Sequence, residues 1–408
     1  MDRHELPARG GLPDAVDEKT LASVHRPHGI MARPGGIMSN DRLISADSHV
    51  VEPPDVWTAR VPARLRERAP HMARMERGDA WVVEGVKDPF PFGLVQCGGL
   101  PPSEYKLWVF WEDVRRGAYD PKERLRECDL SGVAAEVLFP SPRLQNAVMQ
   151  NRDAELQLAC VRAYNDWLSE FCSHDPARLV GIPMLPGVGL DTALAELERT
   201  QRMTGLRGAL LSQYPHGGLA LAREDDALFA RCQEAGIPLH LHVGLSGSPA
   251  GTPALAHSFA GAFTGAFRFY DPPVRTAELI YHGVLDRFPR LQIVLDEVDV
   301  GWVGYFIEQL DDRYARQNPA QKVKLELVPS DYFRRNFHYG IVKDAFGIRN
   351  RDVVGAERIL WSSDFPHATC DYPDYASAIA ADFAGVPDAE RRLILAGNAA
   401  ALYELPAA

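Results

Sequence analysis

Ile44-Ser45-Ala46-Asp47-Ser48-His49 is the stretch from which the fold can be inferred, because it is typical of a buried strand ending in polar side chains. Residues i and i+2 of a strand face the same side, so Asp47 and His49 lie one pleat apart. Pro53 and Pro54 follow and stop the strand. A carboxylate and an imidazole on one face can bind the same divalent ion. Taken alone, such a pair is more often a turn residue beside a surface histidine, so the prediction depends on the rest of the chain.

Seven further apolar segments follow, most of them separated by segments long enough for a helix. Short apolar strands that alternate with helices indicate a parallel sheet covered by helices. Eight such units in one chain favour a closed (β/α)8 TIM barrel of the α/β class over an open sheet. The segments after the first are 134–139, 179–184, 206–211, 238–244, 291–296, 336–341 and 358–364.

Two regions do not fit this repeat. Residues 1–41 are rich in Pro, Gly and charge, so we expect a mobile N-terminal arm before one barrel domain at 42–408. At about 78–112, after the first strand, prolines and aromatic residues are concentrated in an insertion. It packs either on the outside of the fold or, as we predict, as a cap over the site.

Composition excludes several classes of function. The chain has 408 residues and a net charge of −11, and it has no block of Lys and Arg, which argues against a nucleic-acid or membrane-surface partner. No apolar run is long enough to span a membrane, and no secretory signal is recognisable. The six cysteines are scattered without a CxxC pair, which predicts reduced thiols in a cytoplasmic protein. No glycine-rich nucleotide motif follows any strand.

Metal-capable side chains stand at the ends of four predicted strands. Besides Asp47 and His49, these are His240 and His242 on the fifth strand, Asp296 and Glu297 on the sixth, and Asp364 on the eighth. Core packing does not explain them, because buried charges are costly unless they are paired or bound to metal. His242 is nearer the end of its strand and is the better ligand. His240 would lie deeper, as a hydrogen-bond donor to a ligand or as a second ligand.

At these positions the chain resembles the amidohydrolase superfamily, in the branch that includes hydrolases and metal-dependent decarboxylases of aminocarboxymuconate-semialdehyde and of aromatic acids. The resemblance covers most of 42–405 and implies one divalent ion on Asp47, His49, His242 and Asp364. Zn²⁺ is the expected ion and Mn²⁺ the alternative. The motifs are Ile44–His49, Tyr164-Asn165-Asp166-Trp167, Asp175-Pro176-Ala177-Arg178-Leu179, Ile237–His242, Gly283-Val284-Leu285-Asp286-Arg287-Phe288-Pro289 and, most specifically, Ser363-Asp364-Phe365-Pro366-His367.

One position departs from that family. Its decarboxylases have a catalytic histidine after the sixth strand, and Glu297 stands there in this chain. A carboxylate can move protons or bind metal, but it cannot supply a cationic imidazole. This weakens the expectation of decarboxylation and leaves hydrolysis open.

The first hypothesis is therefore a metal-dependent hydrolase that cleaves an amide or related bond of a small-molecule or short peptide-like substrate. The ion would lower the pKa of a bound water toward ~7. Asp364 would take the proton, with Glu297 as an alternative acid or base and His240 as a third catalytic residue. Non-oxidative decarboxylation of an aromatic or unsaturated acid is the second hypothesis, and a barrel that only binds is the third. We expect a homodimer.

Overall fold

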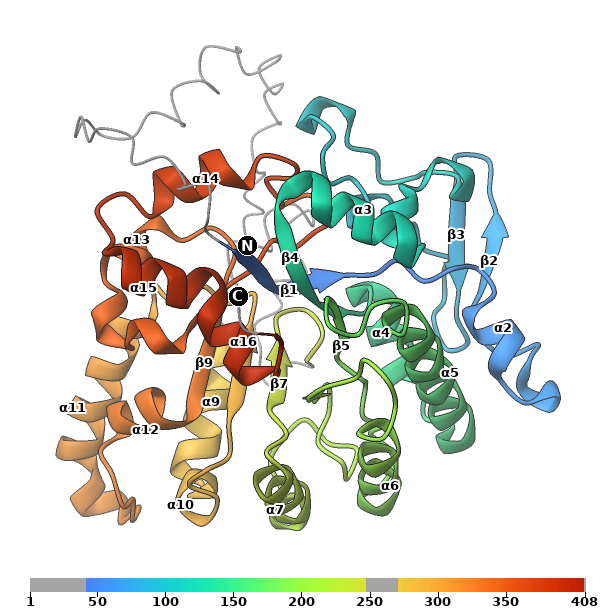
Figure 1. Cartoon of the computed structure of the whole chain (residues 1–408). Coiled ribbons are helices and arrows are strands. Elements are labelled where there is room, and N and C mark those ends of the chain that lie inside the picture. The colour runs from blue at the N-terminus through green and yellow to red at the C-terminus, as the bar shows by residue number, and fades with distance from the viewer. Residues whose placement is uncertain (1–41, 247–270, 407–408) are drawn as a thin grey trace, which may run out of the picture.

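The computed structural model describes residues 42–246 and 271–406, and the predicted N-terminal arm lies outside them. Eight parallel strands form the barrel (Figure 1), as the sequence predicts. Each of the eight expected segments overlaps one of them, and the first two strands begin one residue earlier than expected. The strands are β1 (Leu43–His49), β4 (Val133–Phe139), β5 (Leu179–Gly181), β6 (Ala209–Leu210), β7 (Leu239–His242), β8 (Ile293–Asp296), β9 (Phe337–Ile341) and β10 (Ile359–Trp361).

The strands pair in two groups, β1-β4-β5 and β6-β7-β8-β9-β10. Parallel bridges from Gly181 to Leu206 and from Met184 to Leu210 join β5 to β6. On the other side, the amide of Asp364 donates to the carbonyl of Asp47 and the amide of His49 to that of Phe365. These two bonds join β1 to the residues that follow β10, so the barrel closes at the predicted metal ligands.

Helices surround the strands (Figure 1). The ends of α3 follow ordinary capping rules: the Asp120 carboxylate accepts amide hydrogen bonds at its start, and Gly132 ends the helix at φ 74°. The helices are α2 (Val56–Arg60), α3 (Pro121–Ser131), α4 (Pro142–Met149), α5 (Ala154–Cys172), α6 (Leu190–Thr200), α7 (Asp226–Ala235), α9 (Asp271–Tyr281), α10 (Val284–Arg287), α11 (Val303–Gln321), α12 (Pro329–Asn336), α13 (Ala345–Arg349), α14 (Tyr375–Asp382), α15 (Asp388–Arg392) and α16 (Asn398–Leu402).

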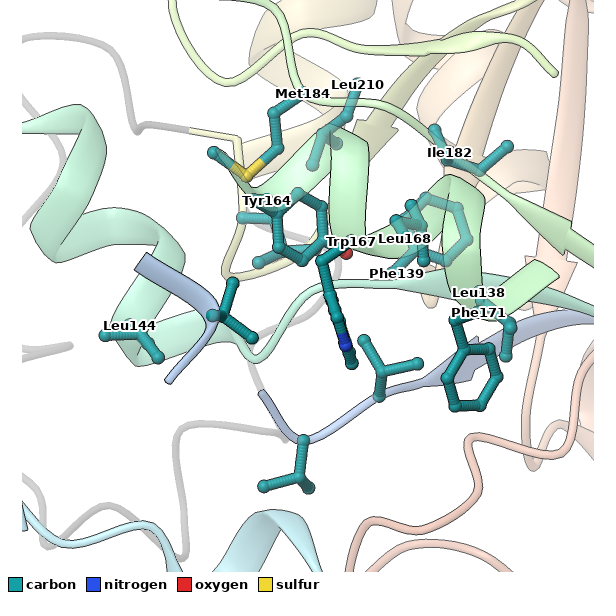
Figure 2. Packing of buried hydrophobic residues seen from close by; sticks show 14 of the residues in the cluster. Leu138, Phe139, Leu144, Tyr164, Trp167, Leu168, Phe171, Ile182, Met184 and Leu210 are labelled. Atoms are coloured by element: carbon teal, nitrogen blue, oxygen red, sulfur yellow. The ribbon is translucent and has the colours of Figure 1, made fainter. Parts of the chain in front are cut away.

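The long helix α5 packs directly on the barrel. Figure 2 shows its Tyr164 and Leu168 among the buried side chains of β4, and both are fully buried. A Cβ placed on Gly181 of β5 would lie 2.6 Å from Cγ of Leu168. Glycine at this position therefore allows the helix to lie close to the strand.

The insertion lies partly at the carboxyl end of the barrel. It begins with β3 (Asp79–Val82), which pairs antiparallel with β2 (His71–Arg74) at one edge of the molecule (Figure 1). Farther along, the amide of Gly98 donates to the carbonyl of Pro366, and the Tyr105 hydroxyl donates to the carbonyl of Ala368. The segment therefore contacts the loop that follows β10. Trp81, in contrast, is buried against Trp57.

In the ranges 42–246 and 271–406, no helix combines the length and the apolar character that crossing a membrane requires. The six cysteines are all free thiols.

Candidate metal centre

The predicted ligands converge at the carboxyl ends of β1, β7 and β10. Asp47, His49, His242 and Glu297 each offer a ligand atom, and these atoms lie within 4.8 Å of one another. Asp364 belongs to an overlapping group with His49 and His367. His49 belongs to both groups, so the four residues predicted as ligands form one connected cluster, with Glu297 in the first group.

Both histidines present the same nitrogen to this point. His49 donates from Nδ1 to the carbonyl of Pro140 at 2.9 Å, and His242 donates from Nδ1 to the carbonyl of Val243. Nε2 of His49 is then free to accept, and it lies 3.4 Å from a carboxylate oxygen of both Asp47 and Asp364. Hydrogen bonding of the far nitrogen to a carbonyl is the usual way in which metal-binding histidines are oriented.

Three buried atoms at the centre are without a hydrogen-bond partner among the described residues: Asp47 Oδ2, His49 Nε2 and Asp364 Oδ1. Leaving one buried polar atom unpaired costs about 1–3 kcal/mol. A divalent ion bound by two imidazoles and two carboxylates would satisfy all three. The donor set therefore fits a metal ion.

Electrostatics at the centre favour added positive charge. Burial opposes a charged ring at His242, yet the Asp47 carboxylate, with help from Glu297 and Asp296, raises its pKa to about 10. Burial also disfavours ionisation of Asp364, but His367 and His49 hold its pKa below the usual value. The carboxylates thus attract a cation into the centre, whether a proton or a metal ion.

Two ligand-bearing positions have an unusual backbone. Glu297 and Asp364 have φ values of 60° and 56°, in the left-handed region that non-glycine residues seldom adopt. Each stands just beyond the end of its strand, and the turn directs its side chain into the centre. Such strain is concentrated at functional sites because the surrounding structure must impose it.

Glu297 differs from the other members in its exposure. Its side chain is 12% exposed, whereas those of Asp47 and His242 are fully buried. Its Oε2 lies 3.9 Å from Nδ1 of His242. Glu297 therefore lies at the edge of the cluster, where a substrate can reach it.

His240 lies deeper, as its place in the strand predicts. Its Nδ1 is 2.9 Å from Oδ2 of Asp296, and both side chains are fully buried. The ring packs against Phe139 and stacks on Tyr403. Neither His240 nor Asp296 belongs to either group of candidate ligands in the described part of the chain.

His367 has a larger part in the site than its position in the sequence indicates. Its Nδ1 lies 3.0 Å from Oδ1 of Asp364, and its ring stacks on His49 with centroids 3.9 Å apart. Thr369 donates to the other oxygen of Asp364. The contact between His367 and Asp364 could be expected from their proximity in the sequence. Nothing in the sequence indicated that the His367 ring stacks on His49.

The comparisons with known proteins agree with this geometry. A family model described as Amidohydrolase matches residues 101–405. Gamma-resorcylate decarboxylase of Rhizobium sp. (strain MTP-10005) is 25% identical over 334 residues, which cover 78% of this chain and 96% of that protein.

Two solved structures show the same fold. An amidohydrolase from Mycobacterium avium subsp. paratuberculosis K-10 has a TM-score of 0.69 at 22% identity, covering 91% of this chain and 99% of its own. A dihydroxybenzoic acid decarboxylase from Polaromonas sp. JS666, with bound manganese and 2-nitroresorcinol, has a TM-score of 0.60 at 22% identity, covering 90% and 98%.

These findings contradict the first hypothesis from the sequence. Amide hydrolysis was inferred because Glu297 replaces the histidine of the decarboxylases, but the relatives matched over most of the chain are decarboxylases. The inference was wrong because the same ligand set serves both reactions, so one substituted position does not decide between them.

Proposed function

This chain belongs to the amidohydrolase family, and from that membership we propose that it is a metal-dependent, non-oxidative decarboxylase of a small aromatic carboxylic acid. The observation that carries the proposal is the similarity to gamma-resorcylate decarboxylase along almost the whole of that protein. The buried ligand cluster at the carboxyl end of the barrel supports it, because that end bears the active site in barrels of this type.

The reaction replaces a carboxylate on a ring carbon by a proton and releases CO₂. A divalent ion bound at this centre would supply the positive charge that favours binding of the substrate's carboxylate. Asp47, His49, His242 and Asp364 would hold that ion. The protein must then deliver one proton to the ring carbon, after which the carbon–carbon bond breaks and its electron pair restores the ring.

Glu297 is the residue that we assign to proton delivery. Its carboxylate is the more exposed of the two candidates. Asp364 is instead a predicted ligand: one of its oxygens accepts from Thr369, and the other, 3.0 Å from Nδ1 of His367, faces the metal site. Glu297 would donate its proton to the ring carbon and recover one from solvent after CO₂ leaves. His240 would act on the site indirectly, through its hydrogen bond to Asp296, the residue directly before Glu297.

The ligand set suits both Zn²⁺, which we expected, and Mn²⁺, which is bound in the Polaromonas structure. Elemental analysis of the purified protein distinguishes them. The homodimer and the cytoplasmic location remain predictions, and sedimentation tests the first.

The proposal is tested by incubating the Mn²⁺-loaded protein in D₂O with 2,6-dihydroxybenzoate and 5-carboxyvanillate, the substrates in the names of two structural neighbours. We expect CO₂ release from at least one aromatic acid, and a product with one deuterium on the carbon that lost the carboxylate. An amide panel assayed in parallel should be inert. Cleavage of amides without CO₂ release from any aromatic acid would overturn the proposal.

A further inference from the structure

A fully buried arginine lies directly behind the metal centre. Arg124 of α3 has no exposed surface, and its Nε donates to the carboxylate of Glu136 on β4, which is also buried. Its guanidinium lies over the ring of Phe365, with Cζ 4.6 Å from the centroid.

Besides a hydrogen bond to the carbonyl of Gly117, the remaining donors of this arginine reach a predicted ligand and the residue after another. One nitrogen donates to the carbonyl of His49 at 2.9 Å, and another donates to the carbonyl of Phe365 at 3.3 Å. His49 is a candidate ligand itself, and Phe365 follows Asp364 directly. A single side chain therefore connects the end of β1 with the turn after β10.

Glu136 reaches the same two elements through serines. The Ser48 hydroxyl donates to Glu136 at 3.0 Å and lies 2.9 Å from the hydroxyl of Ser363. Ser48 stands between Asp47 and His49 in the sequence, and Ser363 directly precedes Asp364. The register of β1 against β4 shifts between Ser45 and Ser48, and these side-chain contacts add to the main-chain pairing that resumes at Ser48 and His49.

Stability alone does not account for this arrangement. Removing two charges from water costs several kcal/mol per ion, and replacing a buried ion pair by apolar residues is often neutral or stabilising. Arg124 and Glu136 instead have contacts that end at the residues beside three predicted ligands. Such outer contacts typically influence metal affinity by about 10–100-fold.

We propose that Arg124 and Glu136 are positioning residues that set the distance between the β1 ligands, Asp47 and His49, and the β10 ligand, Asp364. This inference rests on the proposed metal site and deepens it. The pair holds the two turns from behind, so that the ligand atoms face one ion at the spacing it requires.

The test compares a single and a double variant. In Arg124→Met the Glu136 charge is left buried and unpaired, so we expect the variant to unfold or bind Mn²⁺ poorly. In Arg124→Met/Glu136→Leu both charges are gone, so the fold is retained. We expect circular dichroism like the wild type, a Kd for Mn²⁺ raised by about 10-fold or more, and an altered Mn²⁺ electron paramagnetic resonance spectrum.

Arg287→Met/Asp226→Leu is the matched control. This pair is bidentate, at 2.7 and 2.9 Å, and it connects α10 with α7 away from the ligands. Its removal should leave the Kd and the spectrum unchanged.

Ser48→Ala is a milder second variant, in case the double variant does not fold. It removes the hydrogen bond between β1 and Glu136 together with the contacts of the Ser48 hydroxyl to Ser45 and Ser363, and it leaves both charges in place. Its Kd should rise less than that of the double variant. A folded double variant with the wild-type Kd and spectrum would overturn the inference, as would an unfolded double variant together with an unaffected Ser48→Ala. A wild-type protein that binds no Mn²⁺ would instead contradict the proposed function.

Discussion

The backbone amide of Asp364 donates a 2.9 Å hydrogen bond to the carbonyl of Asp47, so two candidate ligands from opposite ends of the sequence are joined through the main chain. The adjacent bond, from His49 to Phe365, is 2.7 Å long. The same two bonds close the barrel and bring the ligands together. A substitution that breaks them therefore affects both the fold and the metal centre.

His242→Ala should remove most of the bound metal and all of the activity. The ring supplies one of two imidazole donors at a buried centre, and alanine has none to replace it. Elemental analysis and circular dichroism check the result. His216→Ala is the control, because His216 pairs with Asp225 outside both ligand groups. Wild-type metal content in His242→Ala would rule out the assigned ligand.

Glu297→Gln and Asp364→Asn should fail in different ways. If Glu297 delivers the proton, Glu297→Gln keeps its metal and loses about 10²–10⁴-fold in turnover, the usual contribution of a general acid. Asp364→Asn should lose metal as well as turnover, because Oδ1 of Asp364 faces the centre. Metal content and initial rates are measured on both variants. A Glu297→Gln variant with normal turnover would exclude Glu297 as the acid.

Removing the metal with a chelator should abolish activity and lower the melting temperature. The buried carboxylates of Asp47 and Asp364 then lose the cation that satisfies them. A ligand present at 100 times its Kd stabilises the folded state by about 2.7 kcal/mol, so the shift should depend on metal concentration. Scanning calorimetry with added Mn²⁺ or Zn²⁺ measures the recovery. An unchanged melting temperature would contradict a metal bound within the core.

Gly181→Ala should destabilise the barrel by about 1–3 kcal/mol, the usual effect of overpacking. The new Cβ would meet Leu168 at 2.6 Å and Leu206 at 2.8 Å. Gly304→Ala in α11 is the control, since its nearest neighbour in the described residues is Val353 at 3.6 Å and alanine favours a helix. Urea unfolding compares them. If Gly181→Ala and Gly304→Ala had equal free energies of unfolding, the prediction would be wrong, because α5 would then move away from β5 without loss of stability.

The barrel was predictable from the sequence because it depends on local patterns: apolar strands that alternate with helices specify the eight units. Polar side chains at the strand ends indicated where a site could form, whereas the four-ligand set came from the family resemblance and stays a prediction. Helix ends were less predictable: Gly283, at φ 65°, separates α9 from α10 within 274–288, a stretch between the fifth and sixth predicted strands that is long enough for one helix.

The residues behind the metal centre could not be predicted in this way. Arg124 lies in Pro121–Ser131, a segment with mostly charged and polar side chains that is typical of an exposed helix. Its burial depends on the packing of α3 against the ends of β1 and β10, which no local pattern encodes. The choice of reaction was also outside the sequence pattern, because hydrolysis and decarboxylation use the same ligands.

The left-handed backbone at Glu297 also bears on how this branch of enzymes can diversify. Among non-glycine residues, Asn, Asp and His adopt positive φ most readily, whereas β-branched residues are strongly disfavoured. Glutamate at φ 60° is held there by its surroundings rather than by preference. A change from Glu297 to histidine, the residue that the family resemblance implies for decarboxylases at this position, is therefore compatible with the existing turn. Exchange of a carboxylate for an imidazole at this point would thus require no rebuilding of the loop.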